Sequence, residues 1–225
     1  MEERSSYPLT FSVAYPERDL SRLSTFFRIF AAIPIAIVLS LLTSGADYQE
    51  SSSRLRDDAA TGFDRVNSTY TSFGLGFTST LFLPILLMLL FRKKYPGWWA
   101  YWNRELLRFA NRVCVYVLLM DDRYPSTDEQ QAVQLDFPLP DGERLSCGLP
   151  LIKWLLALPH YIVLVFLWIA AAFCVFIAWF AILFTARYPR GLFRFVEGVL
   201  RWQNRVAAYA FILVTDDYPP FSLEP

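Results

Sequence analysis

The chain has 225 residues, of which 55% are hydrophobic and 17% aromatic, and 21 basic and 21 acidic residues give a formal net charge of zero. Because basic residues are not in excess, the composition argues against nucleic acid as a partner. The mean hydropathy of +0.31 is modest for a membrane protein, so much of the chain must lie outside the hydrocarbon.

The N-terminal segment predicts a strand followed by a membrane helix. Residues 9–15 alternate between apolar and small or polar side chains, and this period of two indicates a strand with one buried face. After a polar run, residues 26–43 form the first apolar stretch. We predict that this stretch crosses the membrane with a kink at Pro34.

A polar loop and a second crossing come next. Residues 44–72 carry five acids and three arginines, which predicts a loop. Residues 73–91 form the second predicted crossing, and it ends at the three cations of residues 92–94. Adjacent cations at a membrane exit favour the cytoplasmic side. The 44–72 loop would then lie outside the cell.

Residues 98–119 predict an amphipathic helix at the membrane interface. Its aromatic and aliphatic side chains fall on one face, while Arg104, Arg108 and Arg112 fall on a face roughly opposite. Trp and Tyr favour the headgroup level, and Arg can reach phosphates or solvent. The alternative is that the apolar face packs on the protein's own crossings or strands and that the Arg face is solvated.

Residues 154–186 contain no Lys, Arg, Asp or Glu. As one helix they would span about 50 Å, against about 30 Å of hydrocarbon. We therefore predict a helical hairpin with crossings at 149–168 and 169–187 and a bend near residues 168–171. His160, the one histidine, is either a candidate intramembrane polar site or a neutral residue bonded to a carbonyl that Pro159 frees.

A second amphipathic helix is predicted at residues 190–209, with Arg201 and Arg205 on its polar face. Residues 133–137 alternate as residues 9–15 do and predict another strand. Two apolar, β-branched stretches at residues 115–120 and 210–215 predict further strands. We expect these short strands to pair in a small cytoplasmic sheet.

The two halves of the sequence resemble each other. A shift of 93 residues places Arg108 on Arg201 and Asn111-Arg112 on Asn204-Arg205. Upstream, a shift of 125 places Pro34 on Pro159. The difference between the shifts, 125 − 93 = 32, is accounted for by an insertion at the 44–72 loop.

The duplication predicts repeat one at residues 1–125 and repeat two at residues 126–225. Each copy would have an even number of crossings, so both copies would share one orientation, with a pseudo-two-fold axis along the membrane normal. The expected fold is therefore a mainly α membrane protein. It would contain four transmembrane helices in two hairpins of a parallel repeat, an amphipathic interfacial helix after each hairpin, and short cytoplasmic strands.

Seven polar residues are candidates for binding lipid or another anionic group: Arg104, Arg108, Asn111, Arg112, Arg201, Asn204 and Arg205. An Arg beside an amide suits a phosphate or carboxylate headgroup. The alternative is a hydrogen-bonded anchor that ties each helix to the core. The pairs Asp121-Asp122 and Asp216-Asp217 could bind a cation or exchange protons, or they could simply form turns.

Several segments of the second half carry a family resemblance. They are Leu156–Tyr161, Arg187–Phe193, Arg201-Trp202, Arg205-Val206 and Thr215–Phe221. With these segments the chain resembles the bacterial membrane proteins catalogued as domain of unknown function forty-three eighty-nine. The first half is a degenerate version, with Ile35 at the position of His160. The resemblance implies a bacterial inner-membrane protein and implies no activity.

The sequence contains none of the glycine-rich, nucleophile-elbow or zinc-protease motifs, so we expect no catalytic residues, metal or cofactor. We expect a multi-pass protein of the bacterial inner membrane with cytoplasmic termini. Its partners would be anionic lipids and either another membrane protein or further copies of itself. The first functional hypothesis is a non-catalytic scaffold or accessory subunit of a membrane complex, and the second is an oligomeric transporter or channel for a lipid or small solute.

Overall fold

The computed structural model describes residues 7–43, 85–127, 129–140, 145–146 and 148–224. The elements are β1 (Thr10–Val13), α1 (Arg22–Thr43), α3 (Gly97–Val117), β2 (Val133–Asp136), α4 (Leu149–Leu156), α5 (Leu158–Thr185), α6 (Arg190–Ala207) and the π-helix η1 (Ala208–Ile212). Residues 85–92 are helical as well. The 44–72 loop and residues 73–84 of the second predicted crossing lie outside the described residues.

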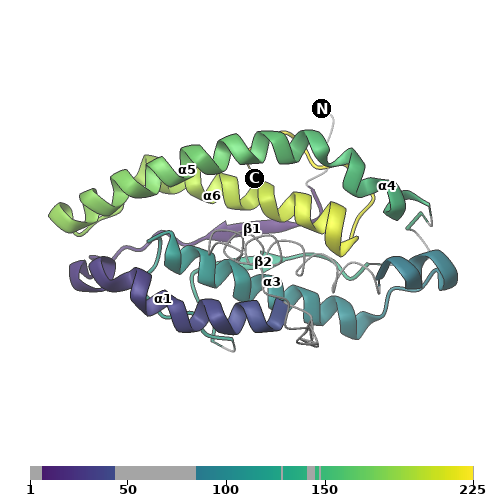
Figure 1. Ribbon diagram of the computed structural model, residues 1–225, viewed down its shortest axis with the longest axis horizontal. Coiled ribbons are helices and arrows are strands. Elements are labelled where there is room, and N and C mark those ends of the chain that lie inside the picture. Colours follow the sequence, from purple (N-terminus) through teal and green to yellow (C-terminus); the bar gives the residue numbers. More distant parts are fainter. Residues whose placement is uncertain (1–6, 44–84, 128, 141–144, 147, 225) are drawn as a thin grey trace, which may run out of the picture.

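The long helices lie side by side, with α5 and α1 at opposite edges and α6 and α3 between them (Figure 1). Helix α6 packs on α5, and α3 packs on α1. Each inner helix packs on the strand that comes from the other half of the chain, α3 on β2 and α6 on β1. The two halves are therefore joined through the sheet as well as through the helices.

Strands β1 and β2 pair antiparallel, with Phe11 opposite Leu135 and Val13 opposite Val133. Both strands lie within the stretches where alternation predicted them, and in both the apolar positions are buried while the positions between them are exposed. Residues 115–120 and 210–215, however, are not strands as predicted. The first stretch continues α3 and ends in a turn, and the second begins inside η1.

Helices α3 and α6 occupy the stretches predicted to be amphipathic, and their apolar faces pack on the protein's own apolar helices. Phe109 and Val113 form a cluster with Ile35 of α1, while Trp202 clusters with Leu164 of α5. This packing of the apolar faces is the one given above as the alternative to a lipid-facing side, but the Arg faces are not solvated as that alternative expected. At the N-terminal end of α3, aromatic side chains such as Trp98 and Trp102 remain exposed.

The predicted hairpin bend at residues 168–171 is wrong, because α5 runs without a break from Leu158 to Thr185. Residues 168–171 read Trp-Ile-Ala-Ala and include neither Gly nor Pro to end a helix. The hairpin prediction came from length alone, and length is not a helix-ending signal. The break comes at Ala157, next to Pro159, where the missing proline N–H and the ring interrupt the hydrogen-bond ladder.

Helix α1 covers the first predicted crossing and is bent by 53° between its parts Arg22–Arg28 and Phe30–Ser40. The bend precedes Pro34 and falls about one turn before it, where the ring of a helical proline meets the preceding carbonyls.

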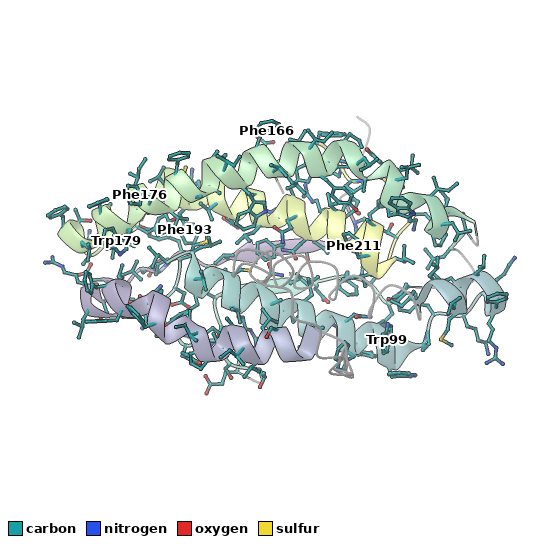
Figure 2. All side chains as sticks on the ribbon, in the orientation of Figure 1. Trp99, Phe166, Phe176, Trp179, Phe193 and Phe211 are labelled. Atoms are coloured by element: carbon teal, nitrogen blue, oxygen red, sulfur yellow. The ribbon has the colours of Figure 1, made fainter. Side chains whose placement is uncertain are left out.

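Helix α5 is the one described helix that alone is long and apolar enough to cross a membrane, and α1 would be a second if its bent parts form one span. With 28 residues, α5 is about 42 Å long. Its large apolar side chains project away from the rest of the molecule, as Phe166 and Phe176 do in Figure 2.

Candidate functional site: a cavity lined by arginines beneath the sheet

The polar faces of α3 and α6 lie against the sheet. Nε of Arg108 donates to the backbone oxygen of Leu135 in β2 at 2.7 Å. Nε of Arg201, 93 residues later, donates to the oxygen of Phe11 in β1 at 2.9 Å. Each arginine thus joins its helix to a strand from the other half of the chain. The sequence predicted a face turned toward solvent or lipid phosphate, and it carries no signal for these backbone acceptors.

Carboxylates partly neutralise these arginines. Arg108 pairs with Glu105 at 2.6 Å, and Arg201 pairs with Glu197 at 2.7 Å. Arg104 pairs with Asp136 of β2 at 3.1 Å. These pairs belong to the framework that holds the inner helices under the sheet.

Asn111 of α3 and Asn204 of α6 are hydrogen-bonded to each other. The Nδ2 of each donates to the Oδ1 of the other, both at 2.8 Å. Each Nδ2 also donates to its own helix, to the backbone oxygen of Leu107 or Leu200. Both amides are buried. This is the anchoring role that the sequence left as one of two alternatives.

Arg112 and Arg205 follow this amide pair directly, and they are 9% and 4% exposed. Each donates through Nη1 to one backbone oxygen, Arg112 to Ser126 at 2.6 Å and Arg205 to Ser222 at 3.3 Å. Within the described part of the chain neither pairs with a carboxylate, and the buried Nε of each has no hydrogen-bond partner. Burial, and then the charge of Arg201, lower the pKa of Arg205.

The arginines line one cavity. It has a volume of about 620 Å³, and Arg108, Arg112, Arg201 and Arg205 all contribute to its wall. Arg104, also predicted for this site, is not part of the lining. Residues from the strands and from the segment before β2 complete the wall, including Tyr7, Gln130 and Gln134. The sequence could not indicate these residues, because the packing of each inner helix on a strand from the other half brings them to the arginines.

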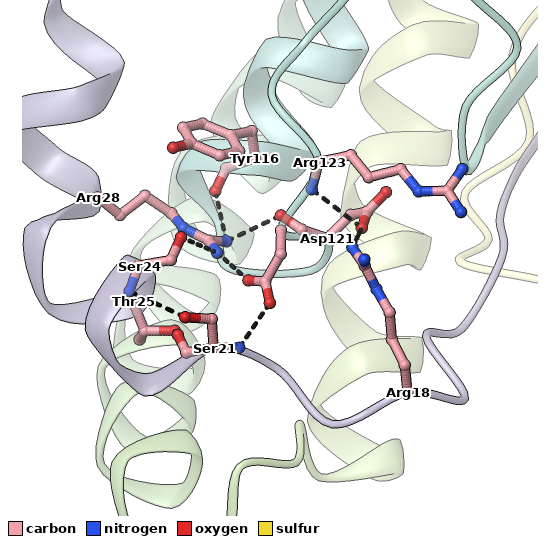
Figure 3. Close-up of polar contacts among 9 residues, drawn as sticks. Arg18, Ser21, Ser24, Thr25, Arg28, Tyr116, Asp121 and Arg123 are labelled. Atoms are coloured by element: carbon pink, nitrogen blue, oxygen red, sulfur yellow. Dashed lines mark hydrogen bonds and ion pairs between the residues drawn. The ribbon is translucent and has the colours of Figure 1, made fainter.

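Two further cations, Arg28 and Lys153, are buried where the apolar helices begin. Arg28 pairs with Asp122 and donates to the backbone oxygens of Tyr116 and Asp121 (Figure 3). Lys153, 125 residues later, pairs with Asp216 at 2.6 Å and donates to a backbone oxygen of the same C-terminal segment. Both cations therefore have anionic partners.

The two Asp pairs thus belong to these contacts and to neighbouring turns. Asp122 and Asp216 also accept a backbone N–H each, from Ser21 and Ser146. Burial alone would raise the pKa of Asp216, but hydrogen bonds from Lys153 and Ser146 hold it below its usual value. The described residues contain no group of three or more His, Cys, Asp or Glu side chains that could hold a metal ion.

His160 is fully buried at the start of α5. Its Nδ1 accepts the indole N–H of Trp202 at 3.0 Å, and its ring stacks on Phe221 with centroids 4.0 Å apart. An accepting Nδ1 makes the ring a neutral imidazole with its proton on Nε2. The histidine therefore links α5 to α6 through the side chain of Trp202. The alternative inferred from the sequence was a different bond, to a backbone carbonyl that Pro159 leaves without its usual partner.

Residues 150–222 match the family model described as Domain of unknown function (DUF4389). The matched region contains α5, α6 and the contacts of His160. No curated protein and no solved structure matches the chain. The comparison therefore relates the second half to a family of unknown function, and a second copy in residues 1–125 stays a prediction.

Proposed function

We propose that the chain is an integral membrane protein that acts as a non-catalytic scaffold or accessory subunit of a larger membrane complex. The observation that supports this proposal most is the outer face of α5. Only 17% of the most apolar 18-residue stretch of α5 is buried, whereas the core helix of a soluble protein is mostly buried. Large side chains such as Phe166, Phe173 and Phe184 are more than half exposed.

Helix α1 adds a second apolar face at the other edge of the molecule. Its exposed large side chains among the described residues are Leu23, Phe26, Phe27, Phe30, Ile33, Ile37 and Val38. Each face groups several exposed large apolar side chains on one helix, and soluble monomers rarely expose contiguous apolar surface of this kind. In the proposed setting lipid tails cover part of this surface and helices of a partner cover the rest.

The proposed location is the bacterial inner membrane, with the C-terminal end of α5 at the cytoplasmic surface. Arg187, Arg190 and Arg194 follow that end, and such clusters favour the cytoplasmic side. The N-terminal segment belongs to the same side, because Asp19 pairs with Arg187 at 3.0 Å.

We also propose that the chain is a tandem duplication around a pseudo-two-fold axis through the Asn111–Asn204 contact. In its favour, contacts recur at positions 93 or 125 residues apart. Arg108 and Arg201 each donate to a backbone oxygen of a strand. Arg28 and Lys153 form ion pairs with Asp122 and Asp216, and the backbone N–H groups of Ser21 and Ser146 donate to the same two carboxylates.

The transporter hypothesis has less support. A pore through the membrane needs polar groups that are free to meet a solute. The polar groups near the apolar helices, Arg28, Lys153 and His160, are instead held by internal partners.

A gentle-detergent pull-down of the tagged full chain from its native membrane, followed by mass spectrometry, tests the scaffold role. We expect a membrane protein to co-purify in a fixed ratio. Replacing Phe166 and Phe173 by Ser on the outer face of α5 should release that partner. Replacing the exposed Gln130 and Gln134 by Ser near the sheet should not. If the wild-type chain repeatedly purifies alone, the proposal fails.

A further inference from the structure

The cavity beneath the sheet contains more positive charge than the protein neutralises. Its lining includes Arg108, Arg112, Arg201 and Arg205 and one carboxylate, Asp136. Asp136 already pairs with Arg104 at 3.1 Å and lies 3.6 Å from Arg108. Arg201 is matched by Glu197. The charges left without a carboxylate among the described residues are those of Arg112 and Arg205.

An unmatched buried cation is costly, because the protein interior solvates charge poorly. Here two such cations face the same cavity, on helices joined by the Asn111–Asn204 amide pair. Their exposures of 9% and 4% show that most of each side chain is shielded from solvent. The buried Nε atoms of Arg112 and Arg205 have no hydrogen-bond partner in the described residues. An anion in the cavity would satisfy both.

We propose that this cavity is a binding site for a phosphate-bearing molecule, held between the guanidinium groups of Arg112 and Arg205. A guanidinium presents a planar fork of N–H donors that matches two phosphate oxygens. Two forks on opposite helices can therefore hold one phosphate from two sides. Arg108 and Arg201 hold the strands that form the wall of the cavity through their hydrogen bonds to backbone oxygens. Their charges also add to the positive electrostatic potential inside the cavity.

The size of the cavity indicates that the ligand is larger than inorganic phosphate alone. A volume of about 620 Å³ is within the range of small-molecule sites. The exposed amides of Gln130 and Gln134 and the apolar side chains of Leu9 and Val133 also line it. A phosphate monoester or the phosphate headgroup of a lipid has this combination of charge, polar oxygens and carbon. Phosphate binding does not depend on the scaffold role proposed above, so a failed pull-down would leave it intact.

The test uses the purified full chain in nanodiscs of phosphatidylcholine, at constant ionic strength set with sodium chloride. Glycerol 3-phosphate is the soluble probe, and nanodiscs that contain phosphatidic acid are the lipid probe. Thermal unfolding and isothermal titration calorimetry provide the readouts. We expect at least one probe to raise Tm and to bind with saturation. Binding of glycerol 3-phosphate would identify the source as a soluble ester, and a response to phosphatidic acid alone would identify it as a lipid.

Two variants locate the site. Arg112→Gln and Arg205→Gln should each weaken binding at least tenfold, and both together should abolish it. Arg194→Gln is the matched control, since Arg194 is also on one of the two inner helices, α6, but is exposed and outside the cavity, and its affinity should stay within about twofold of wild type. Without probe, Arg112→Gln and Arg205→Gln should unfold at or above the wild-type temperature, because each removes an unmatched buried cation. Equal affinity of wild type and the Arg112/Arg205 variants, or no response to either probe, would overturn the proposal.

Discussion

The buried Asn111–Asn204 pair, which joins α3 to α6, should act as one energetic unit. Replacing Asn204 by Leu, which has a similar shape, removes both side-chain bonds between the helices. It leaves the Oδ1 of Asn111 and one of its amide hydrogens buried without a partner. Because each unsatisfied buried group costs about 1–3 kcal/mol, the variant should lose about 2–4 kcal/mol of unfolding free energy.

The double variant Asn111→Leu/Asn204→Leu should lose less than either single variant. Both amides are then gone, no polar group is left unsatisfied, and two leucines can pack against each other. Reversible denaturation of the full chain in mixed micelles, completed as a double-mutant cycle, measures the difference. Asn103→Leu combined with Asn204→Leu is the control. Asn103 is also buried on α3, but it lies about 12 Å along the helix from Asn111, so its effect should simply add.

Additivity of Asn111→Leu and Asn204→Leu within about 0.5 kcal/mol would refute this reasoning. The two amides would then contribute separately, for example through their bonds to Leu107 and Leu200, and α3 and α6 would not be joined through them. A double variant less stable than both single variants would have the same meaning. The proposed axis through this contact would lose its main energetic support.

Three further predictions concern the second half. Lys153→Met should lower the unfolding free energy by about 3 kcal/mol, because it leaves the carboxylate of Asp216 without its buried partner; chemical denaturation measures this. His160→Ile should cost about 1–3 kcal/mol by leaving the indole N–H of Trp202 unpaired, and it should shift the tryptophan fluorescence. Since the folded pKa of Asp216 is lowered, its stabilisation is present above the unfolded value, about 3.9, and is lost as pH falls through the folded value. Stability measured against pH should therefore decline in acid, and Asp216→Asn should flatten that decline.

The sequence predicted those parts of the fold that have a local pattern. Alternation of apolar and polar residues located β1 and β2, and the helical period located α3 and α6 to within a few residues. The shift of 93 residues singled out Asn111 and Asn204, which the structure brings into contact. These predictions worked because side-chain periodicity directly reflects which face of an element is buried.

The errors arose where tertiary context decides. The β-branched residues around Val115 favour strands locally, yet α3 continues there because its apolar face packs on α1. The apolar run through α5 contains no Gly or Pro between His160 and Thr185, so its great length did not produce a bend. The partners of Arg108 and Arg201 are backbone oxygens in β2 and β1, and no residue type marks such acceptors.

The contact between an outer helix and an inner helix differs between the two halves. In the first half Ile35 packs on Phe109, and in the second half His160 and Trp202, 125 and 93 residues later, form a hydrogen bond that Nδ1 of His160 accepts. The second half, most of which matches the family model, therefore has a directional link at this contact that does not involve the cavity. The cavity instead requires residues from both halves, since Arg112 comes from one and Arg205 from the other. A half expressed alone could not form it, so any ligand held there would depend on the intact chain.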